Sequence, residues 1–486
     1  MAAPGGPGVP SGKPRPGGRR AWWLRAALAA EPPDAGSPPL EGATEADVAI
    51  VGGGYTGLWS AWFLSEQSPG SRIVLLEQDI CGGGPSGRNG GFVLGAWDDL
   101  HGLIDLYGED GAVAVARAFA AAVDEIGAWC TSNGLDAQYR RAGYLQVSTC
   151  PEMDGLWLEP LEACARLGVG GELVALSADQ VRARCDSPRF RNGVFMEAAA
   201  TVQPAFLARG LRRVLLERGV TIHEQTPVVA IEAGKARPGP VVLRTPAGEV
   251  RADQAILGLN AWAAGWPWFR SRVLPWSSYI VLTEPIQDRL AEIGWTGGES
   301  IVDARFTLHY LRTTADGRIA FGAGAGRAGF GGRIGSSFTD DADAAGRAAR
   351  GFAHLFPQLH GVALEDAWGG PIDITDDHFP YVGTLPGGRV HFGHGYAGNG
   401  VSQARVGGRI LAALALGRAD ESTRLPFVGR VPRRFPPEPF RFLGARIFRQ
   451  AVLWKEDAEQ QGRKAPWPVR AVARLPRRMG YHIGPS

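Results

Sequence analysis

The stretch Val48-Ala49-Ile50-Val51-Gly52-Gly53-Gly54-Tyr55-Thr56-Gly57 decides how this chain folds. Its first four residues predict a short, fully buried strand, and the six residues that follow match the pattern G-x-G-x-x-G. Apolar residues at helical spacing predict a helix over 58–66, and residues 72–76 predict a second strand that ends in Glu77. The order strand, glycine turn, helix, strand and acidic residue is typical of a site that binds a dinucleotide.

Each glycine of this turn has a physical role in such a site. Gly52 permits the tight turn, Gly54 lets the backbone approach a pyrophosphate, and Gly57 lets the helix pack closely on the strand. The N-terminus of the helix then faces the negative charge of the ligand. Glu77, at the end of the second strand, can accept hydrogen bonds from an adenosine ribose.

A second match to the same pattern, over residues 324–329, lacks this context. It leads into further glycines and Ser336-Ser337 instead of a helix, and no strand with a terminal acid follows it. We interpret it as a glycine-rich loop that follows a strand over 318–321.

Two further glycine-dense segments can bring backbone close to a ligand. The first covers residues 82–91, shortly after Glu77. The second covers 393–400, between a predicted strand at 390–392 and a predicted helix over 401–416. The N-terminus of that helix offers N–H donors, and these would stabilise the anion of a reduced flavin. The two segments favour FAD over a nicotinamide cofactor.

The composition indicates a globular protein of more than one domain. The chain has 486 residues, 45% of them hydrophobic, which is more than one core normally holds. The formal net charge is only +2, so no global basic excess indicates a nucleic-acid partner. Only four of the 51 basic residues are lysines, which matters for oxygen chemistry below.

Cysteine usage and apolar runs bear on the cellular compartment. The five cysteines show no CxxC spacing and no metal-ligand pattern, so we expect no metal site and a reducing, cytoplasmic environment. No run approaches the roughly 18–20 apolar residues that a transmembrane helix needs. The pair Arg19-Arg20 resembles a twin-arginine export signal, but Arg25 interrupts the apolar stretch after it.

The two ends of the chain differ from its body. Residues 1–20 predict a disordered leader, and 21–45 predict a short helix with Trp22 and Trp23 followed by a linker. From residue 421 onward there are 14 Lys or Arg against 5 Asp or Glu, and a helix is predicted over about 440–461. This basic tail either binds an anionic partner or wraps on the acidic body.

Taken together, the motifs resemble those of the D-amino-acid oxidase, glycine oxidase and sarcosine oxidase family of FAD enzymes. Within it the chain is most similar to the gamma-glutamylputrescine oxidase group. The resemblance spans about 46–418 and rests on 46–57 with Glu77, Ser86-Gly87-Arg88-Asn89-Gly90-Gly91, Val202-Gln203-Pro204, Thr226-Pro227-Val228, the strand 252–260 with Ala261-Trp262, 368–383, and Gly395-Tyr396 to Val401.

The resemblance implies an α/β fold, α+β overall, in which a Rossmann-like FAD-binding domain carries an inserted antiparallel-sheet substrate domain. The implied segments are 46–135, 196–274 and 365–418 for the FAD-binding domain, 136–195 and 275–364 for the substrate domain, and 419–486 for the basic tail.

The resemblance also implies a bound FAD, and we predict that it is held noncovalently. No cysteine follows Cys185, and Arg88 stands about where some related dehydrogenases carry a flavin-linking histidine. The residues implied to bind the cofactor are Gly52, Gly54, Tyr55, Thr56, Gly57, Glu77, Gln78, Ser86, Arg88, Asn89, Gly90, Gly91, Val228, Asn260, Gly398, Asn399, Gly400 and Val401.

The chemistry of this family needs a neutral amine whose carbon–hydrogen bond lies over flavin N5. Hydride transfer gives an imine that water hydrolyses, so positioning is the main task and no catalytic base is compulsory. His394, in the third glycine segment, and His309 and Tyr310, on a predicted roof strand, are the candidate catalytic residues. For His394, a purely structural hydrogen-bonding role is the alternative.

The chain departs from the family pattern at two places. Ile372 stands about where glycine oxidase-like relatives place an arginine that clamps the substrate carboxylate. Asp373 then either attracts a cationic amine or holds a loop. Sarcosine oxidase-like members use a lysine near the flavin for oxygen, but the only lysine in the body is Lys235, in a predicted turn at 234–239.

We therefore predict an enzyme that oxidises a small-molecule amine or amino acid with FAD. Either O2 or another electron acceptor would reoxidise the flavin. Two alternatives stay open: an NAD(P)H-using flavin monooxygenase, and a non-catalytic protein that FAD stabilises and that binds a partner through its basic tail. The sequence leaves the oligomeric state open.

Overall fold

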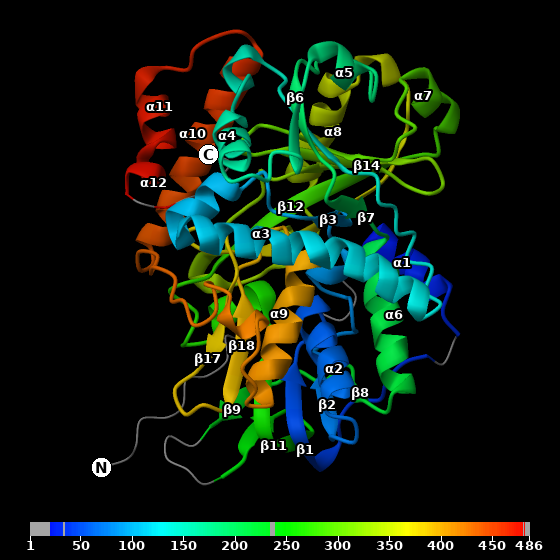
Figure 1. Ribbon diagram of the computed structural model, residues 1–486, viewed down its shortest axis with the longest axis vertical. Helices are drawn as coiled ribbons and strands as arrows, with labels where there is room; N and C mark the ends of the chain where they lie inside the picture. The colour runs from blue at the N-terminus through cyan, green and yellow to red at the C-terminus, as the bar shows by residue number, and fades with distance from the viewer. Residues whose placement is uncertain (1–19, 33–34, 234–238, 480, 482–486) are drawn as a thin grey trace.

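The computed structural model describes residues 20–32, 35–233, 239–479 and 481 (Figure 1). The leader expected over 1–20, apart from Arg20, lies outside the described residues, as does the turn residue Lys235. The described chain forms two large sheets, one below and one above the long helix α3 (Leu100–Ser132) in Figure 1.

The first sheet has β1 (Gly42–Val51) at its centre, and the strand predicted over 48–51 is the buried end of β1. β1 pairs in parallel with both β2 (Ile73–Leu76) and β11 (Gly248–Leu257). A short strand, β10 (Val241–Arg244), pairs antiparallel with β11, and β9 (Ala230–Glu232) pairs antiparallel with β10. The main strands run in the order β17 (Tyr381–Thr384), β18 (Val390–His394), β11 (Gly248–Leu257), β1 (Gly42–Val51), β2 (Ile73–Leu76) and β8 (Thr221–His223).

Helices α2 (Tyr55–Gln67), α6 (Pro204–Glu217) and α9 (Gly400–Ala415) stand in front of this sheet in Figure 1. α2 carries an unbroken run of ten buried residues at its start, because it packs on both the sheet and α9. The parallel strands and the buried crossover helix confirm the predicted Rossmann-like core.

The second sheet is mainly antiparallel and forms the upper half of the molecule. Helices α8 (Ala342–Leu355), α7 (Gln287–Glu292), α4 (Leu158–Arg166) and α5 (Ala178–Arg182) belong to the same half (Figure 1). The order of its strands is β16 (Leu364–Ile374), β12 (Leu274–Thr283), β15 (Ile319–Ala323), β14 (His309–Thr313), β13 (Ser300–Asp303), β4 (Tyr144–Val147), β6 (Gly193–Met196) and β5 (Leu173–Leu176). The predicted antiparallel insertion is therefore present, and the fold class is confirmed.

One boundary differs from the expected one. Residues from 365 were assigned to the FAD-binding domain, but β16 is an edge strand of the second sheet and pairs with β12 from Leu274↔Ile374 to Thr283↔Leu364. The chain returns to the first sheet only at β17. A small two-stranded sheet, β3 (Phe92–Leu94) with β7 (Ala199–Thr201), lies outside both large sheets.

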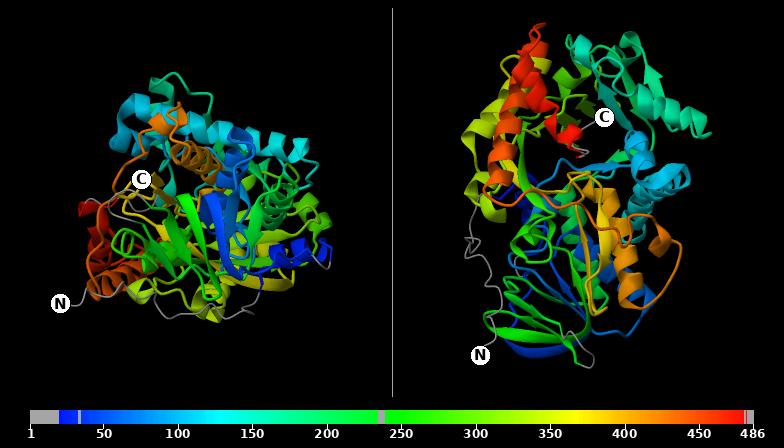
Figure 2. Two further views of the ribbon diagram at one scale, coloured as in Figure 1. Left: turned by 90° about the horizontal axis from the view of Figure 1, so that it is seen from below. Right: turned by 90° about the vertical axis from the view of Figure 1, so that its left-hand side faces the viewer.

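The N-terminal tryptophan helix and the basic tail both fold against the body. α1 (Trp22–Ala29) buries Trp23, whose ring lies edge-on to Trp368, with ring centroids 5.7 Å apart. The tail forms α10 (Phe440–Gln460), α11 (Trp467–Ala473) and α12 (Leu475–Arg478), beside the second sheet (Figure 2). α10 agrees with the predicted helix to within one residue.

Neither a membrane-spanning helix nor a metal site is found in the described residues. None of the helices there is long and apolar enough to cross a membrane. Within the same residues no group of His, Cys, Asp and Glu is arranged to hold a metal ion. The five cysteines are buried, and none forms a disulfide.

Candidate active site

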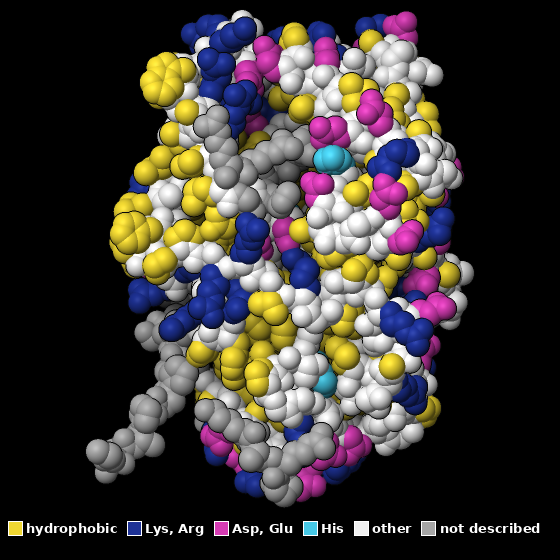
Figure 3. Space-filling model, turned by 60° about the vertical axis from the view of Figure 1, so that its left-hand side comes forward, with side chains coloured by type: hydrophobic (Ala, Val, Ile, Leu, Met, Phe, Trp, Pro, Cys, Tyr) yellow, Lys and Arg dark blue, Asp and Glu magenta, His cyan; other side chains and the backbone are white. Residues whose placement is uncertain are grey.

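A large cavity lies where the two sheets and the tail meet. Its volume is about 2310 Å³, well above the roughly 300–1,000 Å³ of an ordinary small-molecule pocket. Its wall combines the phosphate turn, parts of the two further glycine segments, the inner face of β12 and β14, and side chains of the tail. On the face shown in Figure 3, hydrophobic side chains and Lys or Arg groups gather over the C-terminal helices.

The phosphate turn has the geometry that its glycines predict. Gly52 has φ +107°, and a Cβ there would overlap the carbonyl oxygen of Gly258. A Cβ at Gly57 would overlap the carbonyl oxygen of Gly52, so this glycine lets α2 approach β1 and does not itself line the cavity. Gly54, Tyr55 and Thr56 line the cavity, and Gly54 offers no side chain to cap α2. The N-terminus of α2 is thus open to an anion.

Glu77 lies beside this turn, at the end of β2. Its carboxylate accepts hydrogen bonds from the N–H groups of Gly53, at 2.7 Å, and Asp79, at 2.9 Å. Burial raises the pKa of Glu77 to about 7. Glu77 and its neighbour Gln78 both line the cavity, as the ribose-binding prediction requires.

The loop after β2 is held by its own hydrogen bonds. Ser86 Oγ accepts from the N–H of Tyr55 at 2.9 Å, and Arg88 Nε donates to the carbonyl of Gly83 at 3.0 Å. Burial lowers the pKa of Arg88 to about 10. Asn89 accepts from the N–H of Gly91 at 2.7 Å. Ser86, Arg88, Asn89 and Gly90 line the cavity, whereas Gly91 packs behind it against the carbonyl oxygen of Val202.

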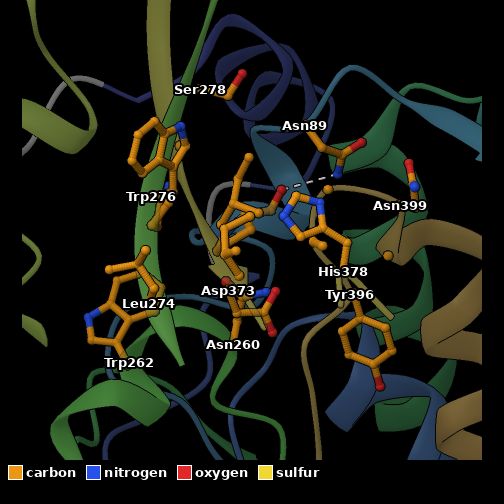
Figure 4. A pocket seen from close by; sticks show the side chains of 18 of the residues that line it. Asn89, Asn260, Trp262, Leu274, Trp276, Ser278, Asp373, His378, Tyr396 and Asn399 are labelled. Carbon is orange, nitrogen blue, oxygen red and sulfur yellow. Dashed lines mark hydrogen bonds between the residues drawn. The ribbon is translucent and has the colours of Figure 1, made fainter. Parts of the chain in front are cut away.

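The loop before α9 completes the wall. Gly398, Asn399, Gly400 and Val401 line the cavity at the start of the helix, and Asn399 points into it in Figure 4. Asp373, only 1% exposed, accepts a hydrogen bond from the N–H of Gly395 at 2.7 Å. Burial raises the pKa of Asp373 to about 6, and the N–H groups of residues 395–397 offset part of that rise.

Some buried polar atoms in the cavity wall lack a hydrogen-bond partner in the described part of the protein. Asn260 Oδ1 and His378 Nε2 are buried, and neither has a hydrogen-bond partner in the protein. Both residues face the interior beside Asp373 in Figure 4. Val228 also lines the cavity. The N-terminus of α2, the carboxylate at the end of β2 and these unpartnered polar atoms together fit a bound FAD.

Of the three candidate catalytic residues, only Tyr310 reaches the cavity. Its hydroxyl shares a 2.7 Å hydrogen bond with Ser278 Oγ, and burial raises the pKa of Tyr310 to about 12. Side chains alternate along β14, so His309 points to the other face, where Nδ1 lies 2.8 Å from Asp303 Oδ2. His309 lines a separate, smaller pocket.

His394 does not line the cavity either. Its ring is fully buried, with centroid distances of 4.4 Å to Phe269 and 5.7 Å to Phe392. Burial lowers the pKa of His394 to about 3. Its position in the loop suggested contact with the ring of the cofactor, but the last residue of β18 points its side chain into the apolar layer behind the sheet.

Sequence reasoning missed several cavity residues. His378, with φ 63°, lines the cavity just after β16, and burial lowers its pKa to about 4. Asp98 and Asp99 line it at the start of α3. Burial raises the pKa of both carboxyls, and the charge of Asp99 raises that of Asp98 further. A polar run directly after a buried strand was the available signal for His378.

Known proteins resemble this chain in sequence and in structure. The chain is 28% identical over 414 residues to gamma-glutamylputrescine oxidoreductase of Escherichia coli. The alignment covers 83% of this chain and 92% of the relative. It is also 28% identical over 387 residues to a probable oxidoreductase, OrdL, of Haemophilus influenzae, covering 78% of this chain and 85% of that one.

Solved structures share the fold. L-proline dehydrogenase from P. horikoshii superposes with a TM-score of 0.64 at 17% identity, covering 80% of this chain and 98% of the other. Glycine oxidase from Geobacillus kaustophilus superposes with a TM-score of 0.63 at 18% identity, covering 80% and 99%. The resemblance inferred from the motifs is confirmed, as is the prediction of an enzyme.

The sequence model of the family described as "FAD dependent oxidoreductase" matches residues 47–414, most of the chain. The protein therefore belongs to this DAO family of FAD-dependent oxidoreductases.

Proposed function

We propose that the protein oxidises the C–N bond of an amine or amino acid, with FAD held noncovalently in the large cavity. One observation carries the proposal: the phosphate turn and the polar groups of β12, β14 and β16 line one continuous cavity. A cofactor laid along the turn would present its ring to these polar groups. Bound FAD would accept a hydride from the carbon next to nitrogen, and water would hydrolyse the imine that forms.

The residues of the first half would hold the cofactor by its polar ends. The open N-terminus of α2 would face the pyrophosphate and Glu77 the ribose, while the backbone of 398–401 would face the pyrimidine edge. No cysteine is found among the described residues that line the cavity, and Arg88 is engaged with the carbonyl of Gly83. These features support noncovalent attachment.

Asp373 and His378 are the groups we assign to the amine. Asp373 is ionised above its pKa of about 6, so at neutral pH it would attract an ammonium group. The depressed pKa of His378, about 4, keeps its ring neutral and able to accept a hydrogen bond from the amine. Tyr310 and Ser278 would complete the polar side of the site.

The position of Ile372 bears on the substrate class. Its side chain cannot form the bidentate pair that an arginine would make with a carboxylate. Arg333, Arg441 and Arg449 also line the cavity, and two of them belong to α10. A substrate with a distal carboxylate would therefore be held from the side of the tail, and one with a second amine by the acidic side chains.

The cysteines of the enzyme bear on its cellular location, and its chemistry bears on its electron acceptor. Free, buried cysteines support a reducing, cytoplasmic location. O2 and a separate electron acceptor both remain candidates for flavin reoxidation.

Anaerobic reduction of the purified holoenzyme tests the proposal. We expect an amine or amino acid from a panel of mono-amines, diamines, and primary and secondary amino acids to bleach the visible flavin absorption. Bleaching by NADPH alone would contradict the proposal in favour of a monooxygenase-type enzyme. No bleaching by any compound would favour a non-catalytic role. Stopped-flow mixing of the reduced enzyme with O2 or a quinone then identifies the acceptor.

A further inference from the structure

A second pocket lies on the far side of β14, away from the large cavity. Its volume is about 470 Å³, within the size range of a small-ligand site. α8, α10 and the strands β14 and β15 form its walls. Its polar lining includes four arginines and two histidines: Arg305, Arg347, Arg350, Arg449, His309 and His354.

The charges in this lining are strongly unbalanced. Four arginines line it against one carboxylate, that of Asp457, whose side chain is 69% exposed. The two histidines add little to this excess, because burial lowers the pKa of His354 and His309 is paired with the buried Asp303. The nearby Glu456 is buried, but both of its oxygens accept hydrogen bonds from Thr307. Within the described residues Arg305 is paired with Glu456 and Asp457, whereas Arg347, Arg350 and Arg449 form no ion pair.

The two inner arginines have N–H groups without acceptors. Arg305 is 7% exposed, and its Nε has no hydrogen-bond partner, since the oxygens of Glu456 and Asp457 lie 3.8 Å and 3.7 Å from its guanidinium. Arg347 Nε is also buried and without a partner. A buried guanidinium N–H that lacks an acceptor is costly, and an anion in the pocket would satisfy it.

The arginines also repel one another. Arg347 Nη2 and Arg449 Nη2 both donate to the carbonyl of Ala325, at 3.0 Å and 2.8 Å, so two guanidinium groups meet at one oxygen. Burial, followed by the charges of Arg347 and Arg327, lowers the pKa of Arg449 to about 10. Burial and the neighbouring arginines 327 and 350 lower the pKa of Arg347 as well.

From this geometry we propose that the pocket binds a compact oxyanion of the size and charge of phosphate or a small dicarboxylate. Its oxygens would accept hydrogen bonds from the arginines and neutralise their repulsion. The ligand would bridge α8 and the strands to the tail helix α10. Arg449 and Thr307 line both this pocket and the large cavity, so anion binding would also fix the wall that the tail contributes to the active site.

Binding of inorganic phosphate to the holoenzyme tests the proposal. Calorimetric titration of the FAD-loaded protein in a chloride buffer should give one saturable site, and phosphate should raise Tm by a few degrees. Succinate, at matched ionic strength, is the dicarboxylate arm, and added chloride is the control for ionic strength. Binding of either oxyanion supports the site and identifies its chemical class.

The key variant is Arg350→Glu, an exposed position on α8 that lines the pocket and that the substrate-binding machinery does not include. We expect it to weaken phosphate or succinate binding at least tenfold, whereas Arg350→Lys keeps part of the affinity. Arg117→Glu, at an exposed position on α3, makes the same charge change outside the pocket and should bind as the wild type does. No binding of either oxyanion, or equal binding by Arg350→Glu and wild type, would overturn the proposal.

Discussion

The two halves of the large cavity are built on different principles. The half formed by the first sheet depends on backbone: glycines whose Cβ atoms would collide, a helix N-terminus without a cap, and one acid at a strand end. The half formed by the second sheet and the tail depends on side chains from segments far apart in the chain. A site built from backbone tolerates almost no substitution, whereas a site built from side chains can change its affinity by substitution. We therefore expect the first half to bind the cofactor and the second half to determine which substrate binds.

The largest effect should come from breaking the backbone half with Gly52→Val. A valine there adopts a strained positive φ and overlaps the carbonyl of Gly258, at a cost of about 3 kcal/mol or more. We expect purified protein with no bound FAD and a lower Tm, measured by visible absorption and thermal unfolding.

Gly171→Ala is the matched control for this prediction. A Cβ at Gly171 meets nothing within 4 Å, and its φ lies outside the left-handed range. This variant should retain FAD as the wild type does. Full flavin retention by Gly52→Val would show that the phosphate site lies elsewhere.

The next largest effect is expected in the half of the cavity that the second sheet forms. Asp373→Asn removes the charge that we assign to the ammonium group, and a hydrogen bond to a charged group is worth about 1.5–3 kcal/mol. We therefore expect kcat/KM for the best amine to fall about 10- to 100-fold, with FAD retained. Asp376→Asn changes an adjacent carboxylate that does not line the cavity, and it should leave kcat/KM within a few-fold of wild type. Equal losses in the two variants would argue against an amine-binding role for Asp373.

The pH profile tests the same carboxylate without changing its shape. The pKa of Asp373 is raised to about 6, so its charge is present above that pH and is lost as the pH falls through it. We expect kcat/KM to decline below about pH 6 in the wild type, and this step should be absent in Asp373→Asn. A step of the same size and midpoint in both proteins would assign it to another group.

Stability should respond to Asp373 in the opposite direction. A carboxyl whose pKa is higher in the folded than in the unfolded state disfavours folding once it is ionised. Its contribution to the free energy of unfolding therefore falls as the pH rises from about 4 to about 6. Asp373→Asn should flatten that part of the stability curve in denaturant unfolding.

The smallest effect is expected from substitutions at two neighbouring residues of β14, Tyr310 and His309. Tyr310→Phe removes a hydroxyl that faces the cavity, and we expect a loss of about 3- to 10-fold in kcat/KM, the size of one neutral hydrogen bond. His309→Gln, on the opposite face, should lower Tm through its contact with Asp303 and leave kcat within a few-fold of wild type. Steady-state kinetics and thermal unfolding of both variants distinguish the two faces of the strand.

The backbone half of the cavity could be predicted from the sequence more fully than the side-chain half. The phosphate turn depends on neighbours within ten residues, and the limits of α10 are marked by Pro439 and Gly462, so both were predictable. That β16 joins the second sheet depends on its pairing with β12, about ninety residues earlier, which leaves no local signal.

The side-chain half was harder to predict for a related reason. His394 is the last residue of β18, and His378 follows β16. The direction of the first side chain depends on the exact strand end, and that of the second on the positive φ of His378. The resemblance to the family could not place the tail in the cavity wall, because the matched region ends at residue 414.

The central claim is that the cavity holds FAD without a covalent bond. Its most direct test is the visible spectrum of the purified protein before and after acid precipitation. We predict a flavin spectrum in the native protein and, after precipitation, FAD in the supernatant with a colourless pellet. Colour that stays with the pellet would contradict noncovalent binding. A colourless protein that cannot be reconstituted with FAD would contradict the account of the cavity as a whole.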